Sequence, residues 1–178
     1  MSDFTVLQQL LEAEGYVCTP LAASWLHPVA HLVIGPFSLA LDPAADQPLS
    51  FSLDLLFSND MLLAAGLNAP ASETLLLACV LPLPVPADRL ADVCCLLSFC
   101  NRLLPLGTLF LNQQEALSFR YTFKAESREA IEPQLVLAAL KLSLGVLTAW
   151  APLVHDLAAG ATTLAQAAAS LHKTFADA

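Results

Sequence analysis

Two histidines, His27 and His31, stand four residues apart, the spacing at which two imidazoles share one face of a helix and can bind a metal ion together. Pro28 lies between them, and residues 29–34 have the composition of a strand. An extended chain would hold the two rings far apart. Because no further ligand pattern accompanies the pair, we expect no metal site.

Five cysteines could supply thiol chemistry. Their number is odd, no C-x-x-C motif occurs, and the chain opens without a secretory signal peptide, so we expect reduced thiols and a cytoplasmic protein. Cys94, Cys95 and Cys100 fall in one predicted helix. Cys94 and Cys100 join its apolar face, which predicts core thiols, whereas Cys95 falls near the polar side. A redox protein that uses Cys95 is therefore an alternative, provided that the pKa of this thiol is lowered.

Other patterns of catalysis and nucleotide binding are missing from the sequence. There is no G-x-S-x-G, no P-loop and no G-x-G-x-x-G, and six glycines leave few positions for a phosphate cradle. No spacing of acidic residues singles out an acid–base pair. We expect a non-enzymatic protein without a cofactor. An enzyme with an unrecognised site and a regulatory or scaffold protein of unknown partner stay open as alternatives.

The charge of the chain is strongly acidic. Its 178 residues include 7 Lys and Arg against 16 Asp and Glu, which gives a net charge of −9. All seven cations follow residue 88, and nine acidic residues precede Arg89. This balance argues against nucleic-acid binding, which needs clustered cations. The acidic first half would attract a cationic partner, although simple solubility is the other reading.

Both helices and strands are predicted to position these side chains. The length suits a single domain over residues 1–178, in which residues 160–178 form a helical extension. Residues 59–71 are predicted to be a connection with one loose helical turn. Spacing of apolar residues predicts helices over 4–14, 87–104, 133–154 and 164–175. Alternation and apolar runs predict strands over 29–34, 37–41, 49–57, 74–83, 108–112 and 116–124.

Local signals support several of these boundaries. Residues 112–115 are predicted to form the turn of a hairpin between the last two strands. Pro133 suits the first turn of a helix. Thr163 and Gln166 have the spacing of a capping box, in which each side chain bonds to the backbone N–H of the other.

The helix over residues 87–104 carries the best candidate for an interaction surface. Its apolar residues occupy one half of the helix, and Phe99 lies on the opposite half among polar residues. A ring in that position faces water unless a partner covers it, although single exposed aromatic residues are common.

The segment from Leu135 to Val154 is long and apolar enough to raise the question of a membrane span. Gln134, Lys141 and Thr148 recur every seven residues, which predicts one narrow polar face. A lysine near mid-bilayer costs about 3 kcal/mol on the insertion scale, and no basic cluster flanks the segment. We therefore expect a helix that packs on the sheet and on another element or a second copy. A membrane-associated protein is the third hypothesis.

The run LLSFCNRLLPLGTLFLNQQEALSFRYTF at residues 96–123 resembles the YbjN-type family, which is related in fold to the class I type III secretion chaperones (CesT-like). The matching features are Asn101 near a helix end, Pro105 and Gly107 in the connection, the apolar strand with Leu109, and the return strand at residues 119–121. The resemblance implies an α+β domain of order α-β-β-β-α-β-β-α, here with an extra C-terminal helix. It also implies a bacterial, acidic, usually dimeric protein that holds an extended segment of a partner or secreted protein.

Taken together, these features predict a cytoplasmic, chaperone-like module that forms a homodimer and binds a peptide or protein client of cationic character. We expect no nucleic acid and no membrane span. The candidate interface residues are Phe99, Leu96, Leu103, Leu109, Leu111 and Trp150.

Overall fold

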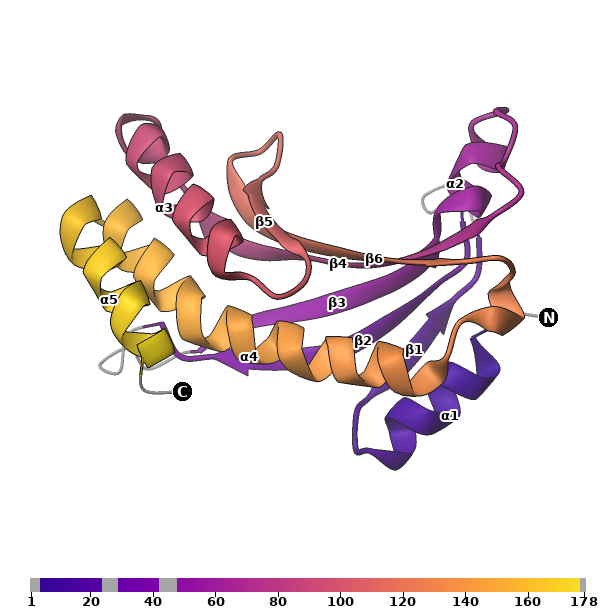
Figure 1. Ribbon diagram of the computed structural model, residues 1–178. Helices are drawn as coiled ribbons and strands as arrows, with labels where there is room; N and C mark the ends of the chain where they lie inside the picture. Colours follow the sequence, from indigo (N-terminus) through magenta and orange to yellow (C-terminus); the bar gives the residue numbers. More distant parts are fainter. Residues whose placement is uncertain (1–3, 24–28, 42–47, 177–178) are drawn as a thin grey trace. The chain divides into compact units, whose positions relative to one another are not determined.

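The structure, a computed structural model, describes residues 4–23, 29–41 and 48–176. Within these residues the chain forms five α-helices and a six-stranded antiparallel sheet (Figure 1), so the predicted α+β class with packed helices is confirmed. The strand order is β1-β2-β3-β4-β6-β5. In chain order the elements are α1 (Thr5–Ala13), β1 (Cys18–Leu21), β2 (His31–Leu39), β3 (Leu49–Phe57), α2 (Ser58–Ala64), β4 (Glu73–Pro84), the 3₁₀ turn η1 (Ala87–Arg89), α3 (Leu90–Leu103), β5 (Thr108–Leu111), β6 (Ala116–Ala125), the 3₁₀ turn η2 (Arg128–Ala130), α4 (Pro133–Ala158) and α5 (Leu164–Ala176).

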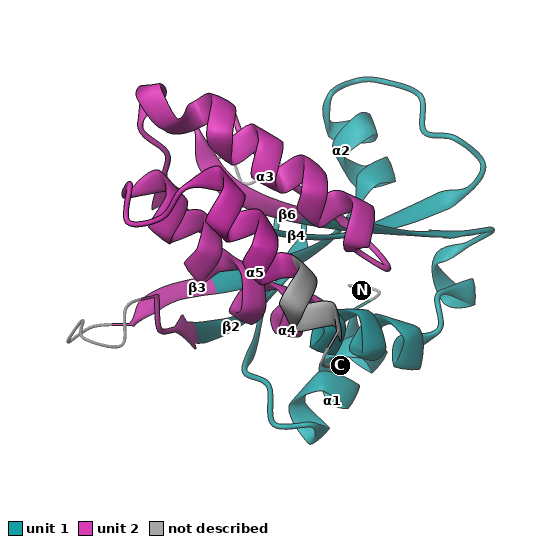
Figure 2. Cartoon of the chain, turned by 60° about the vertical axis from the view of Figure 1, so that its left-hand side comes forward, with its two compact units in different colours: residues 1–37, 52–79, 120–142 teal, residues 38–51, 80–119, 143–178 magenta. Residues whose placement is uncertain are grey.

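The chain divides into two compact units (Figure 2). Unit 1 contains residues 1–37, 52–79 and 120–142, and unit 2 contains residues 38–51, 80–119 and 143–178. Each unit is therefore assembled from three separate segments. Residues 160–178, expected as an extension, belong to unit 2, where α5 contacts α3.

Unit 1 is built on paired strands. β1 runs antiparallel to β2 with Cys18 opposite Ile34, and β3 runs antiparallel to β4 with Leu55 opposite Leu77. Helix α1 contacts β1. Phe4, which directly precedes α1, stacks on Phe57 of β3 with ring centroids 5.0 Å apart. Burial of these apolar side chains holds the helix and the strands of this unit together.

Unit 2 places α3 against both α5 and β5. The residues of α3 that are buried are Val93, Leu96, Leu97 and Cys100, which is the helical face that apolar spacing predicts. Thr163 and Gln166 form the expected capping box at the start of α5. The Thr163 N–H donates to Gln166 Oε1 at 2.9 Å, and the Gln166 N–H donates to Thr163 Oγ1 at 3.3 Å. Such a cap satisfies backbone donors that the first turn leaves open.

Three boundaries differ from the sequence-based expectation. The strands predicted over 29–34 and 37–41 are one strand, β2, which continues through Gly35 and Pro36. Ile34 and Leu39 are both buried although they are five positions apart, a spacing that a regular strand places on opposite faces, so the buried face changes at Gly35–Pro36. Strand β1 was not predicted because it is short and contains Pro20. Residues 58–64 form helix α2 where mainly a connection was expected.

Helix α4 has the polar face that its seven-residue repeat predicts. Gln134, Lys141 and Thr148 are exposed, and Lys141 Nζ lies 2.6 Å from Glu14 Oε2 at the end of α1. In the part of the chain that the structure describes, α4 is the one helix with the length and hydropathy of a membrane span. Half of its most apolar 18-residue stretch is buried within the chain. That it does not cross a membrane stays a prediction.

Candidate binding groove between α3 and β5

The candidate site is a groove of about 460 Å³ in unit 2 between α3 and β5, here called the α3–β5 groove. Leu97 and Leu109 form its buried floor, and Phe110 and Leu111 are half-buried at its β5 side. Arg102 is the one charged residue in its lining. The lining residues are Cys94, Leu97, Ser98, Asn101, Arg102, Leu109, Phe110 and Leu111. A mainly apolar groove with a few polar side chains is the usual character of a binding site.

Asn101 holds strand β5, which forms one wall of this groove, against α3. From the last turn of α3, its Nδ2 donates to the carbonyl oxygen of Leu109 and its Oδ1 accepts from the N–H of Leu109, each at 2.8 Å. One amide side chain thus bonds to both backbone groups of a residue in the edge strand β5, as a neighbouring strand would. Leu109 is consequently closed to pairing with another strand. Sequence reasoning noted Asn101 through the family resemblance and did not predict this role.

The candidate interface residues divide into surface and interior positions. Leu96, Leu109 and Trp150 are buried within the chain and so are core residues in this structure. They were selected because they are apolar, and apolar spacing on a helix is the signal of a core face as much as of an interface. Phe99 is 39% exposed on α3. Leu103 and Leu111 are half-buried.

The thiols of α3 do not follow the prediction completely. Cys100 is buried as expected, and burial raises its pKa to about 12. Cys94 is exposed and lines the α3–β5 groove, so its assignment to the core was wrong. It lies at the margin of the apolar half of α3, and the face that actually packs is narrower than that half. Cys95 is exposed, as expected.

We expect Cys94 to react with Ellman's reagent in the folded protein at pH 8 far faster than Cys100. Cys100 is shielded, and its raised pKa leaves almost no thiolate at this pH. Mass spectrometry after partial labelling measures the two rates, and labelling in guanidinium chloride gives the unfolded reference. Equal rates in the folded protein would show that this face of α3 does not pack as described.

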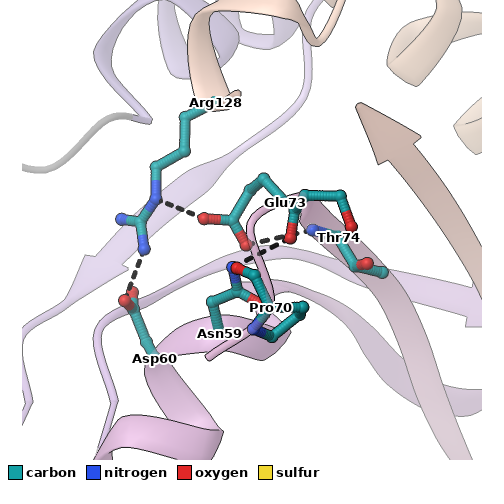
Figure 3. Close-up of polar contacts among 7 residues, drawn as sticks. Asn59, Asp60, Pro70, Glu73, Thr74 and Arg128 are labelled. Atoms are coloured by element: carbon teal, nitrogen blue, oxygen red, sulfur yellow. Dashed lines mark hydrogen bonds and ion pairs between the residues drawn. The ribbon is translucent and has the colours of Figure 1, made fainter. Parts of the chain in front are cut away.

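A network of polar side chains in unit 1 centres on Arg128 of η2 (Figure 3). Its Nε donates to Glu73 Oε2 at 2.8 Å, and its Nη2 forms an ion pair with Asp60. Its guanidinium carbon lies 4.2 Å from the centroid of the Phe57 ring. Glu73 is buried, with only 8% of its side chain exposed. Arg128 therefore joins η2 to the start of β4 and to helix α2 through charge-assisted bonds.

Asn59 strengthens the same region (Figure 3). Its Nδ2 donates to the carbonyl oxygens of Ser72 at 3.0 Å and Pro70 at 3.4 Å, which ties the connection before β4 to α2. These two acceptors settle the orientation of the amide, because the flipped form would direct Oδ1 at the two carbonyls. The sequence offers no local signal for this network, since the side chains of Asn59 and Arg128 bond to residues more than ten positions away.

Unit 1 also holds two cavities of about 390 Å³ each. One lies beside α2 and includes His31 and Asp54 of neighbouring strands, and the other lies beside α1 and includes Arg128. Nδ1 of His31 is 3.3 Å from the carbonyl oxygen of Val29. His27, the other member of the predicted histidine pair, lies outside the described residues. No cluster of three or more His, Cys, Asp or Glu suited to a metal occurs among the residues described.

Comparisons with known proteins assign no family to this chain. No family of known proteins matches it, and no curated protein does. Among solved structures, the crystal structure of an uncharacterized protein from Methanothermobacter thermautotrophicus is similar to it over 82% of this chain and 94% of that chain, with 13% sequence identity and a TM-score of 0.37. A likeness at this level carries no argument about function. The resemblance to YbjN-type proteins and secretion chaperones stays a prediction.

Proposed function

We propose that this protein is a non-enzymatic binding module that holds an extended apolar segment of a partner protein in the α3–β5 groove. The apolar lining of that groove is the observation that carries the proposal. Phe110 and Leu111 keep part of their surface accessible beside the buried Leu97 and Leu109. Leucine or similar side chains of a client would gain about 25 cal/mol for each Å² of apolar surface that they bury there.

The edges of the sheet favour recognition by side-chain packing over addition of a strand. At the β5 edge, Asn101 already bonds to both backbone groups of Leu109. At the β1 edge, Pro20 lacks a backbone N–H. Both are devices by which proteins prevent an exposed edge from pairing. The client therefore binds in the groove by packing of its side chains and not by backbone pairing with a sheet edge.

The client is cationic in this proposal, and the module is chaperone-like, cytoplasmic and homodimeric. The net charge of −9 supports a cationic client, because the field of an acidic protein accelerates its association with a basic segment; this long-range attraction acts against Arg102, the one charged residue in the lining of the groove. The resemblance over residues 96–123 supports the chaperone-like character and the dimer.

The test uses two fluorescein-labelled twelve-residue peptides that have leucine at the same positions and either lysine or glutamate elsewhere. Fluorescence anisotropy should show that the lysine peptide binds more tightly. Leu111→Glu should weaken its binding at least tenfold, because the substitution puts a carboxylate into the apolar groove. Circular dichroism and thermal melting confirm that the variant is folded.

Val80→Glu is the matched control, since Val80 of β4 is 53% exposed and lies outside the lining of the groove. Binding of the lysine peptide should change less than about twofold in this variant. If wild-type protein binds neither peptide, or if both variants lose binding equally, the groove is not the binding site and the proposal is wrong.

A further inference from the structure

The cavity beside α2, here called the α2 pocket, belongs entirely to unit 1. It is lined by His31, Asp54 and Leu56 from the sheet and by Met61, Ala64 and Ala65 at α2. Its volume of about 390 Å³ lies within the range of small-molecule sites, which is about 300–1,000 Å³. Among the described residues, none lines both this pocket and the α3–β5 groove, so the two are separate sites.

The alternation of the strands explains how polar side chains reach the α2 pocket. Leu53 and Leu55, on either side of Asp54 in β3, are completely buried, so Asp54 lies on the opposite face of the sheet. His31 precedes the fully buried Leu32 in β2 in the same way. Helix α2 follows β3 directly and brings its own residues over this second face. The two elements thus form a hollow in which two polar residues lie beside apolar ones.

Most of the lining of the α2 pocket is apolar and accessible to solvent. Met61 keeps 47% of its surface exposed, and Leu56 is half-buried. Ala64 and Ala65 are exposed, and their small side chains leave room in the hollow. Removal of such apolar surface from water is favourable. The pocket therefore suits a ligand with an apolar body.

The charge of the α2 pocket favours a cation. Among the described residues that line it, Asp54 has the one formal charge, and there is no Lys or Arg. A carboxylate offers about four acceptor positions, so Asp54 can accept from a ligand in addition to its interactions within the chain. Ala64 and Ala65 lie at the C-terminal end of α2, where the helix dipole is negative. Both features attract an ammonium group and repel a carboxylate or phosphate.

We propose that the α2 pocket binds a small primary amine with an apolar body. The ammonium group donates to the carboxylate of Asp54, and the apolar body packs on Leu56 and Met61. Nδ1 of His31 lies 3.3 Å from the carbonyl oxygen of Val29, which holds the imidazole ring at the side of the pocket. This inference is independent of the proposed function, because it concerns another site and another class of ligand.

Three small molecules of similar shape test the choice of a cation. Phenethylamine is the probe, hydrocinnamate has a similar body with a carboxylate, and phenethyl alcohol has the same body without a charge. Isothermal titration calorimetry with the full chain should show that phenethylamine binds at least tenfold more tightly than hydrocinnamate, because a charge-assisted hydrogen bond to Asp54 is available only to the amine. Phenethyl alcohol should lie between the two.

Three variants test the location. Asp54→Asn should weaken the binding of phenethylamine at least tenfold and change that of phenethyl alcohol less than about twofold, because it removes a charge and keeps the shape. Asp88→Asn makes the same change of net charge at a side chain that is 80% exposed and outside the pocket, so phenethylamine should bind as in wild type. Ala64→Leu fills the pocket from an exposed helical position and should weaken both ligands at least fivefold. Circular dichroism and thermal melting confirm that each variant is folded.

The inference is overturned if phenethylamine does not bind at millimolar concentrations, if hydrocinnamate binds as tightly, or if Ala64→Leu has no effect. Equal effects of Asp54→Asn and Asp88→Asn would overturn it as well. If Asp54→Asn but not Asp88→Asn abolishes binding of the lysine peptide, the pocket holds a lysine of the client and the assignment to a free amine is wrong. If phenethylamine binds as described and neither peptide binds, the proposed function fails and this inference holds.

Discussion

Arg128→Ala is expected to lower the free energy of unfolding by about 1.5–3 kcal/mol, the contribution of hydrogen bonds to charged groups, because Arg128 and Asp60 are partly exposed while Glu73 is buried. Glu73 would keep its charge in a site where 8% of its side chain is exposed, and Asp60 would lose its cation as well. The contact between the guanidinium and the Phe57 ring would also disappear. Urea denaturation followed by circular dichroism measures the change.

Two other variants separate charge from geometry in this network. Arg128→Lys keeps the positive charge but cannot make the planar, two-partner arrangement. Its free energy of unfolding should therefore lie between those of wild type and Arg128→Ala. Lys124→Ala removes an exposed cation from β6 and should change the stability by less than about 0.5 kcal/mol. A loss below about 1 kcal/mol for Arg128→Ala would contradict the network of Figure 3.

Asn101→Ala is expected to destabilise the protein by about 2–3 kcal/mol, because two hydrogen bonds to the backbone of Leu109 are lost at about 1 kcal/mol each and their groups are left partly buried. The same denaturation measurement applies. Hydrogen exchange should show in addition that the amide of Leu109 loses its protection. An unchanged exchange rate at that amide would show that Asn101 does not hold β5.

Asn101→Asp distinguishes the effect of these two hydrogen bonds from that of simple packing. Aspartate has nearly the same shape and can still accept from the N–H of Leu109, but it directs a carboxylate oxygen at the carbonyl oxygen of Leu109. This variant should therefore be at least as unstable as Asn101→Ala at pH 7. Equal stability of wild type and Asn101→Asp would mean that the donor of Asn101 contributes nothing.

Periodicity predicted those parts of the fold in which one face of an element meets the core. The buried side of α3, the hairpin of β5 and β6, the start of α4 at Pro133 and the capping box before α5 depend on residues within a few positions of each other. Helix α2 and strand β1 were missed because each is short, and β1 contains Pro20. Burial of Ile34 and Leu39 in one strand depends on the conformation at Gly35 and Pro36 rather than on a simple alternation.

The candidate site was predicted only in part, for a physical reason. Apolar residues of α3 and β5 could be chosen from the sequence, but which of them face solvent depends on tertiary packing. Leu96 and Leu109 turned out to be buried, while Phe99 and Cys94 are exposed. Likewise the bonds of Asn101 to Leu109 and of Arg128 to Glu73 and Asp60 join segments that no local pattern connects.

Hydrogen–deuterium exchange with and without the lysine peptide tests the central claim most directly. If the α3–β5 groove holds the client, added peptide should slow exchange in the segment from residue 94 to residue 111, and the Leu111→Glu variant should show no such change. Slowed exchange confined to α1, α2 or α4, or no slowing anywhere at a saturating concentration of peptide, would contradict the proposed function.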